Sequence, residues 1–305
     1  MKKIAFIIHG KIRRRQALSD EIRIVFSPYY KIDFFITTHR GHATELAATA
    51  VMEGANYMIS VGGDGTLNEV ANGLMRALPQ MEQRKKICLG LLPFGTGNDF
   101  SRTIRVTRSL ESLKAYIDND RCHEIDLGQA TFTGLKGMKE QRFFVNITDV
   151  GIGGFIVRSL DNSSKIFGAF LTYQYAIFYA FFHYRKQPLR IRADDWSYEG
   201  KAMELVIANG QFIGGGLCIA PGAKPDDGKF LLALGGKISL WDYLKNWSNI
   251  QHGEKIDHPE AYYQSAQKVL VEAMAEQIPI DMDGDFVGYT PLEISMIPQA
   301  IRFLY

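Results

Sequence analysis

The sequence predicts two domains, an open α/β domain followed by a mostly antiparallel, β-rich one. Its 305 residues are about twice the roughly 150 residues of an average domain. The first hundred residues alternate short apolar runs with longer amphipathic ones, which is typical of βαβ units around a parallel sheet. After about Asp126, strand-like stretches are separated by turns rich in Gly, Pro and Asp, which favours antiparallel pairing. We therefore expect domains at residues 1–125 and 126–305.

The elements of the first domain follow from hydrophobic periodicity. Continuous apolar runs bounded by turn signals predict buried strands at residues 4–8, 32–37, 57–61 and 87–92. Apolar residues at helical spacing among good helix formers predict helices at residues 41–53, 66–78 and 109–117. This order of strands and helices predicts an open α/β layer.

The second domain is predicted from shorter strand signals. They fall at residues 142–148, 189–192, 202–208, 230–234, 269–273, 278–282 and 291–297. A last strand near residues 299–305 could join either domain, because it follows the antiparallel run but is itself a short apolar stretch. We expect a β-sandwich-like second domain.

Composition excludes several classes of protein. Hydrophobic residues make up 46% and charged residues 22% of the chain, as in soluble folded proteins and unlike disordered or polytopic membrane proteins. A net charge of +2 does not favour a nucleic acid partner. The three cysteines, Cys88, Cys122 and Cys218, lie far apart in the sequence, so we expect neither a disulfide framework nor a zinc site. With no signal-peptide pattern, a reducing, cytoplasmic location is expected.

Residues 166–184 form a long, aromatic and nearly uncharged segment. Its length approaches the roughly 18 to 20 residues of a membrane span. However, Thr172, Gln174, His183 and several tyrosines dilute it, and a span here would split the second domain across a bilayer. We therefore expect a buried or interfacial helix that allows peripheral membrane contact.

A glycine-rich turn carries the strongest chemical signal. Gly62-Gly63-Asp64-Gly65-Thr66 follows a predicted strand and precedes a predicted helix. Glycines let a backbone approach a bulky anion, and Thr66 and the helix N-terminus offer donors to phosphate oxygens. The spacing matches neither a P-loop nor the dinucleotide-binding fingerprint. An aspartate would repel phosphate unless a divalent cation lies between them or the carboxylate takes a proton. We therefore predict that Asp64 binds a metal ion or acts in acid/base chemistry. A helix cap in a tight turn would explain Asp64 alone, but not three glycines as well.

A second turn, residues 92–100, ends the next predicted strand. Parallel strands that end on one edge of an α/β sheet form one ligand crevice, so the two turns are expected to face one site. Thr96 and Asn98 can donate or accept hydrogen bonds toward a nucleotide. Asp99 is either a second acidic group or a helix cap.

These two motifs together resemble the bacterial diacylglycerol kinase and YegS-like lipid kinase family. GGDGTLNE is followed about thirty residues later by LPFGTGNDFSR, and sphingosine kinases and NAD kinases are more distant relatives. The resemblance continues in the second half through Asn209-Gly210, the glycines 214–216 and residues 220–228. It implies an NAD-kinase-like α/β domain, a C-terminal β-sandwich, and ATP and lipid meeting between them.

The resemblance also implies site residues. ATP contacts would fall on Thr37 and Thr96, with Asn98 close by, and on the turn and helix start formed by Gly62, Gly63, Asp64, Gly65, Thr66, Leu67 and Asn68. A structural Mg²⁺ would be held by the Asp227 carboxylate and the carbonyls of Lys224 and Lys229. From the residues alone, Pro-Asp-Asp-Gly is a good turn whether or not a metal binds.

Two departures from the family pattern stand out. The first strand ends in His9-Gly10-Lys11, where relatives commonly have Asn-Pro and Ser-Gly, so backbone amides of Gly10 and Lys11 would have to replace that contact, with His9 structural. Asp285 stands where the family has a glutamate acting as general base. The missing methylene would withdraw the carboxylate by roughly 1 Å, a misplacement that can cost about 10²-fold in rate.

The expected function is therefore transfer of the γ-phosphoryl group of ATP, with Mg²⁺, to a hydroxyl of a diacylglycerol-like lipid. Asp285 and Asp64 would be the catalytic residues. The expected partners are a membrane lipid at the inner membrane surface and a second copy of the chain in a homodimer. Phosphorylation of a soluble acceptor such as NAD, and a nucleotide- or lipid-binding regulator without catalysis, are the alternatives.

Overall fold

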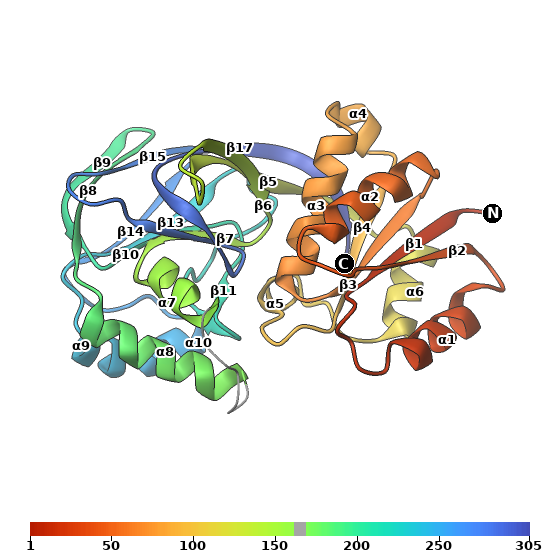
Figure 1. The fold of residues 1–305 in the computed structure, drawn as a ribbon, viewed down its shortest axis with the longest axis horizontal. Coiled ribbons are helices and arrows are strands. Elements are labelled where there is room, and N and C mark those ends of the chain that lie inside the picture. Colours follow the sequence, from red (N-terminus) through yellow and green to blue (C-terminus); the bar gives the residue numbers. More distant parts are fainter. Residues whose placement is uncertain (162–168) are drawn as a thin grey trace. The chain divides into compact units, whose positions relative to one another are not determined.

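The computed structural model describes residues 1–161 and 169–305. The chain divides into two compact units: unit 1 comprises residues 1–127 and 298–305, and unit 2 comprises residues 128–297. The chain therefore passes from unit 1 to unit 2 and returns to unit 1 for its last strand (Figure 1).

Unit 1 is built around a parallel sheet in the order β2-β1-β3-β4, and the end of β17 is added beside β4. Its strands are β1 (Lys3–Ile8), β2 (Lys31–Ile36), β3 (Tyr57–Gly62), β4 (Cys88–Pro93) and β17 (Asp285–Leu304). All four contacts between neighbouring strands are parallel. The short apolar runs thus form the parallel sheet that their pattern predicts, and the terminal strand pairs Arg302 with Cys88.

Helices cover both faces of this sheet (Figure 1). They are α1 (Arg15–Phe26), α2 (His42–Met52), α3 (Asp64–Ala77), α4 (Met81–Arg84), α5 (Asp99–Thr103) and α6 (Leu110–Asp118). Apolar side chains of α1 and α6 pack on the side of β1 that carries Ile4, Phe6 and Ile8. Helices α2 and α3 pack against each other, and Gly73 allows it, because a β-carbon there would overlap the Thr44 carbonyl. The predicted helices at 41–53, 66–78 and 109–117 are confirmed, whereas α1 had no counterpart among the predicted elements.

Unit 2 is mostly antiparallel. One run of strands follows the order β14-β13-β10-β7-β16-β17, and β15, β8 and β9 continue from β17. The strands are β5 (Cys122–Gly134), β6 (Lys139–Phe144), β7 (Ile147–Gly151), β8 (Gln187–Ala193), β9 (Trp196–Ala202), β10 (Glu204–Ala208), β11 (Phe212–Ile213), β12 (Leu217–Cys218), β13 (Phe230–Gly235), β14 (Ala261–Ala266), β15 (Lys268–Ala273) and β16 (Pro279–Met282). Their inward-facing side chains form an apolar cluster, which includes Phe144, Phe230 and Leu292. The predicted β-rich second half is confirmed.

The described residues of this unit also form the helices α7 (Ile152–Asp161), α8 (Ala169–His183), α9 (Leu240–Lys245) and α10 (Trp247–His252). Helix α8 covers most of the predicted aromatic segment, and residues 166–168 lie outside the described residues. Among the described helices, no stretch has the length and hydropathy needed to cross a membrane.

The structure corrects the expectation for the cysteines. Cys88 and Cys122 form a disulfide, with Cα atoms 6.2 Å apart. The two residues begin β4 and β5, so the fold brings together positions that are 34 residues apart in the sequence. No local spacing rule can detect such a pair.

Candidate functional site

The two glycine-rich turns meet in unit 1. They follow β3 and β4, which are adjacent and parallel. A β-carbon on Gly95 would overlap the Cα of Gly63, and a β-carbon on Gly63 would lie 3.0 Å from the Cα of Gly95. Because only glycine permits this approach, the two turns form one continuous backbone surface at the carboxyl ends of the strands.

The Asp64 carboxylate joins the two turns. Its Oδ2 accepts the backbone N–H of Asp99 at 3.0 Å, and its Oδ1 accepts that of Phe100 at 3.0 Å. These are the first residues of α5, where a carboxylate satisfies otherwise unpaired N–H groups and interacts favourably with the helix dipole. Asp64 therefore has a structural role in this unit, whatever it contributes to phosphate or metal binding.

Glu69, in the same motif, also caps a helix. Its Oε1 accepts the Gly41 N–H at 2.8 Å and its Oε2 accepts the Ala43 N–H at 3.0 Å. Gly41 precedes α2 with a left-handed φ of 85°, so the carboxylate fixes the loop that joins β2 to α2. The two acids of GGDGTLNE thus hold two different loops around the start of α3.

The other residues predicted to contact the nucleotide differ in how accessible their side chains are. Thr96 is exposed, whereas Asn98 bonds its own turn, accepting from the Gly95 N–H and donating to the Gly95 carbonyl, each at 2.8 Å. The side chains of Leu67 and Asn68 are buried. Their contribution to a ligand would therefore come from the backbone at the start of α3.

The first loop is tied to the second strand. The Gly10 N–H donates to the Thr37 hydroxyl at 3.0 Å, and Arg15 Nη1 donates to the Gly10 carbonyl at 2.7 Å. The Lys11 N–H has only a long contact, 3.4 Å, with His9 Nδ1. Of the two amides expected to replace the family contact, Lys11 is thus the better placed to bind a ligand.

Asp285 belongs to unit 2, where it begins β17. Arg142 of β6 donates from Nη2 to Asp285 Oδ2 at 2.8 Å, and both side chains are about four-fifths buried, at 21% and 23% exposure. Nearby, the Asp283 carboxylate accepts the backbone N–H groups of Val145, Asn146 and Ile147 at 2.8 to 3.0 Å. Asp283 therefore fixes the hairpin that carries Asp285, and Arg142 orients the Asp285 carboxylate.

The predicted metal residues form an exposed turn. Lys224, Asp227 and Lys229 are exposed, and Asp227 Oδ1 accepts the Lys229 N–H at 3.3 Å. One carboxylate and two carbonyls are oxygen donors of the kind Mg²⁺ accepts alongside water. The described residues contain no group of three or more His, Cys, Asp or Glu side chains able to hold a metal. The turn thus fits a hydrated ion rather than a closed protein cage.

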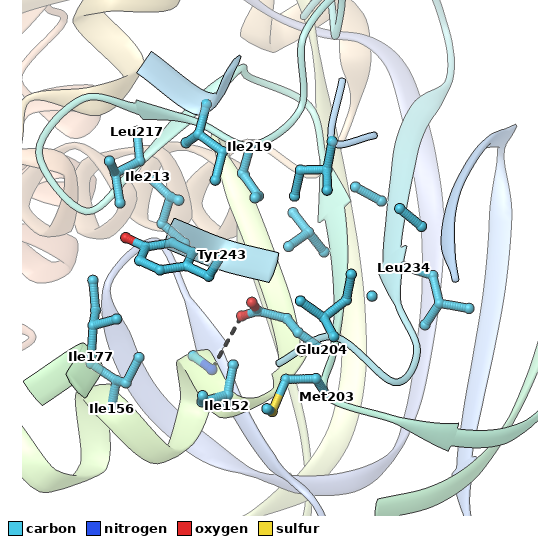
Figure 2. A pocket seen from close by; sticks show the side chains of 18 of the residues that line it. Ile152, Ile156, Ile177, Met203, Glu204, Ile213, Leu217, Ile219, Leu234 and Tyr243 are labelled. Carbon is cyan, nitrogen blue, oxygen red and sulfur yellow. Dashed lines mark hydrogen bonds between the residues drawn. The ribbon is translucent and has the colours of Figure 1, made fainter. Parts of the chain in front are cut away.

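Unit 2 also contains an apolar cavity of about 120 Å³. Its walls come from α7 to α10 and from strands of the sheet, and aliphatic and aromatic side chains dominate them, among them Ile152, Ile156, Ile177, Phe181, Met203, Ile219 and Tyr243 (Figure 2). Among the described lining residues, Glu204 is the one that can carry a charge. Its carboxylate points into the cavity, and its Oε1 accepts the Gly153 N–H at 3.1 Å (Figure 2).

Two further carboxyl groups lie behind this wall. Asp149 of β7 and Asp281 of β16 are partners in the antiparallel register and are 0% and 2% exposed. A β-carbon on Gly153 would overlap oxygens of both Asp149 and Glu204, so these two groups are close neighbours. Burial, and then the neighbouring carboxylates, raise the pKa of Asp149 and of Asp281, and burial raises the pKa of Glu204 to about 7. Protons are therefore retained in this cluster at neutral pH.

Comparison with known proteins assigns both halves of the chain. Residues 3–130 match the diacylglycerol kinase catalytic domain, and residues 148–305 match the YegS C-terminal NAD kinase beta sandwich-like domain. The chain belongs to the YegS-like diacylglycerol kinase family. This confirms the resemblance drawn from the two glycine motifs.

Relatives and solved structures agree with this family assignment. A diacylglycerol kinase of Staphylococcus haemolyticus is 28% identical over 99% of this chain and 88% of its own length. One from Staphylococcus saprophyticus is 27% identical over 99% and 95%. A diacylglycerol kinase structure from Bacillus anthracis, at 21% identity, covers 100% of this chain and 97% of that one with a TM-score of 0.71. A putative diacylglycerol kinase from the same organism gives a TM-score of 0.76, which supports the predicted fold class.

Within this diacylglycerol kinase family member, several site residues escaped sequence analysis. Glu69 stands in the first motif, but its partners lie 26 and 28 residues earlier. Arg142 and Asp285 are 143 residues apart. In the sequence, Glu204 is a single polar residue near the start of a predicted strand, with no motif around it. Only Asp283 had a local signal, since Asp-Gly at a strand end predicts a turn.

Proposed function

We propose that this chain is an ATP-dependent lipid kinase that transfers the γ-phosphoryl group of ATP to a hydroxyl of a diacylglycerol-like lipid. The observation that carries the proposal is the contact between the turns at Gly63 and Gly95, which creates a glycine-lined surface beside the start of α3. Such a glycine-lined surface, with the N–H groups of a helix start beside it, suits a chain of phosphates. The family assignment and the apolar cavity of unit 2 support a lipid acceptor.

On the nucleotide side, the chain supplies positioning. We propose that backbone amides of residues 62–68, the exposed Thr96 and the Thr37 loop orient the phosphates, while Asp64 and Glu69 keep the surrounding loops fixed. Phosphoryl transfer depends mainly on such in-line positioning and on charge stabilisation. A bound Mg²⁺ would supply part of that stabilisation, with Asp64 facing the phosphates and the turn at Asp227 holding a structural ion.

On the acceptor side, Asp285 is the proposed general base. A carboxylate that accepts the hydroxyl proton must be ionised and correctly oriented. Arg142 provides the orientation, because its Nη2 donates to Asp285 Oδ2 at 2.8 Å and so fixes the direction of the carboxylate. This contact also offers a way to hold the shorter aspartate in a productive position where relatives have glutamate.

We also propose that unit 2 contacts the membrane through α8 and α9. The aromatic surface consists of Tyr175, Phe178, Tyr179 and Phe182 on α8 with Trp241 and Leu244 on α9, which are 38% to 80% exposed. The inner sides of the same helices line the cavity through Ile177, Phe181 and Tyr243. The exposed cations Arg185 and Lys245 lie at the ends of these helices. Aromatic side chains flanked by cations favour an anionic bilayer surface, and the use of ATP favours its cytoplasmic side.

Replacing Phe182 and Trp241 together by alanine should lower binding to vesicles of phosphatidylcholine and phosphatidylglycerol by about 10- to 100-fold, because two exposed aromatic side chains no longer enter the interface. Sedimentation with vesicles measures this change. Met52→Ala, which removes an exposed apolar side chain of unit 1, is the matched control and should bind as wild type does. Unchanged binding of the double variant would refute the aromatic surface.

The lipid acceptor is identified by incubating the protein with γ-labelled ATP, Mg²⁺ and a mixed-lipid extract, followed by mass identification of the product. A lipid-soluble phosphate monoester supports the proposal. A labelled water-soluble product would indicate a soluble acceptor such as NAD, and nucleotide binding without any product would indicate a regulator.

A further inference from the structure

The cavity of unit 2 has polar groups that a plain hydrocarbon cannot satisfy. Glu204 directs its carboxylate into the space toward the ring of Tyr243, whose hydroxyl points away from that carboxylate (Figure 2). One oxygen of Glu204 accepts from Gly153. The Tyr243 hydroxyl is buried and makes no hydrogen bond within the described residues. The remaining described lining is apolar except for Tyr263, whose hydroxyl accepts the Ile256 N–H at 3.0 Å.

Filling this space with a saturated chain would leave the Tyr243 hydroxyl without a hydrogen bond and would give Glu204 no partner beyond the Gly153 N–H. A buried polar group that loses its partner costs more than the bond itself contributes when formed. A purely apolar site would have leucine or methionine at position 204, as at the neighbouring Met203 and Leu205. The carboxylate therefore argues for a ligand that brings a polar group into the cavity.

A hydroxyl group is the chemistry that fits. Burial, opposed by the Gly153 N–H, raises the pKa of Glu204 to about 7. The buried carboxyl group of Asp149 is a close neighbour of Glu204, and Asp281 is the strand partner of Asp149. The two polar groups of the lining decide between the possible ligand groups. An ammonium group cannot accept from the Tyr243 hydroxyl and a carbonyl cannot donate to the Glu204 carboxylate, whereas a hydroxyl can donate to a carboxylate and accept from a phenol.

We propose that Glu204 is a specificity-determining residue, which makes the cavity select a lipid whose chain carries a hydroxyl group over the same lipid with a plain chain. This inference rests on the proposed lipid kinase function and names the class of lipid that its cavity accepts. The hydroxyl in question lies in the hydrocarbon part, distinct from the one that receives phosphate.

The test measures binding alone, without ATP or turnover. Displacement of a fluorescent fatty acid from the full chain is compared for octadecanoate and a set of hydroxyoctadecanoates that differ in hydroxyl position. Wild type should bind at least one hydroxylated isomer about 10-fold more tightly than octadecanoate, a difference of about 1.4 kcal/mol. Glu204→Leu should reverse that preference by a similar factor.

Three variants complete the experiment. Glu204→Gln, which still offers hydrogen bonds, should keep part of the preference, and the exposed Glu276→Gln should keep all of it. Ile219→Phe, which fills the cavity, should weaken displacement by every ligand. Equal binding of plain and hydroxylated chains in wild type, or the same preference in Glu204→Leu, would overturn the inference. If wild type prefers the hydroxylated chains but phosphorylates no lipid, the result would count against the proposed function and not against this inference.

Discussion

Asp285→Asn should lower kcat by about 10² to 10⁴-fold, the usual effect of removing a general base. An amide cannot accept the hydroxyl proton, although it nearly preserves the size of the side chain. The contact with Arg142 at 2.8 Å would weaken as well, because a neutral partner replaces a carboxylate. Steady-state assays with saturating ATP, Mg²⁺ and one diacylglycerol measure the change.

Two companion variants make this result interpretable. Asp285→Glu should lose much less activity, since it restores the family's carboxylate, with a modest cost where the added methylene crowds the Arg142 contact. The exposed Asp195→Asn in the same unit should behave as wild type. Equal activity of wild type and Asp285→Asn would assign proton removal to another group. An inactive wild type rescued by Asp285→Glu would favour the regulator hypothesis.

Asp64→Asn should lower kcat/KM for ATP by about 10²-fold or more and also destabilise unit 1. In the proposed site Asp64 faces the phosphates and a divalent cation, and removing its charge there would remove an electrostatic contribution of that size. In addition, asparagine offers a single oxygen to the Asp99 and Phe100 N–H groups that Asp64 now accepts, which should lower the free energy of unfolding by about 1 to 2 kcal/mol.

Measuring both quantities separates the two roles of Asp64. Glu69→Gln serves as the matched capping control, because Glu69 accepts two N–H groups in the same way from the α2 loop. If Asp64→Asn and Glu69→Gln lose stability to the same extent but only Asp64→Asn loses catalysis, Asp64 acts beyond its cap. Near-normal turnover of Asp64→Asn would refute the catalytic role and leave the cap alone.

The sequence predicted those parts of the fold that local patterns determine. The four apolar runs of unit 1 and helices α2, α3 and α6 have strong periodicity, and all were predicted to within a few residues. Helix α1 was missed because its residues 15–26 are rich in charged side chains, and only Leu18, Ile22 and Phe26 mark its buried apolar side. Several short helices of unit 2 are set by tertiary packing around the cavity, which no window of sequence reveals.

The candidate site divides in the same way. The two glycine turns were predicted to meet because adjacent parallel strands end on the same edge of a sheet, and the contact between Gly63 and Gly95 bears this out. The double cap by Asp64, the Arg142–Asp285 pair and the Cys88–Cys122 disulfide join residues distant in sequence. Such pairs form only when the chain folds, so they cannot be predicted from the composition of the sequence or from the spacing of its residues.

The central claim, phosphoryl transfer from ATP to a lipid hydroxyl, is tested most directly with pure components. The purified chain is incubated with γ-labelled ATP, Mg²⁺ and a defined diacylglycerol in mixed micelles. We predict that label appears in phosphatidic acid in proportion to enzyme and lipid, and is lost with Asp285→Asn. Label that stays in ATP or inorganic phosphate, whatever the amount of lipid, would contradict the claim.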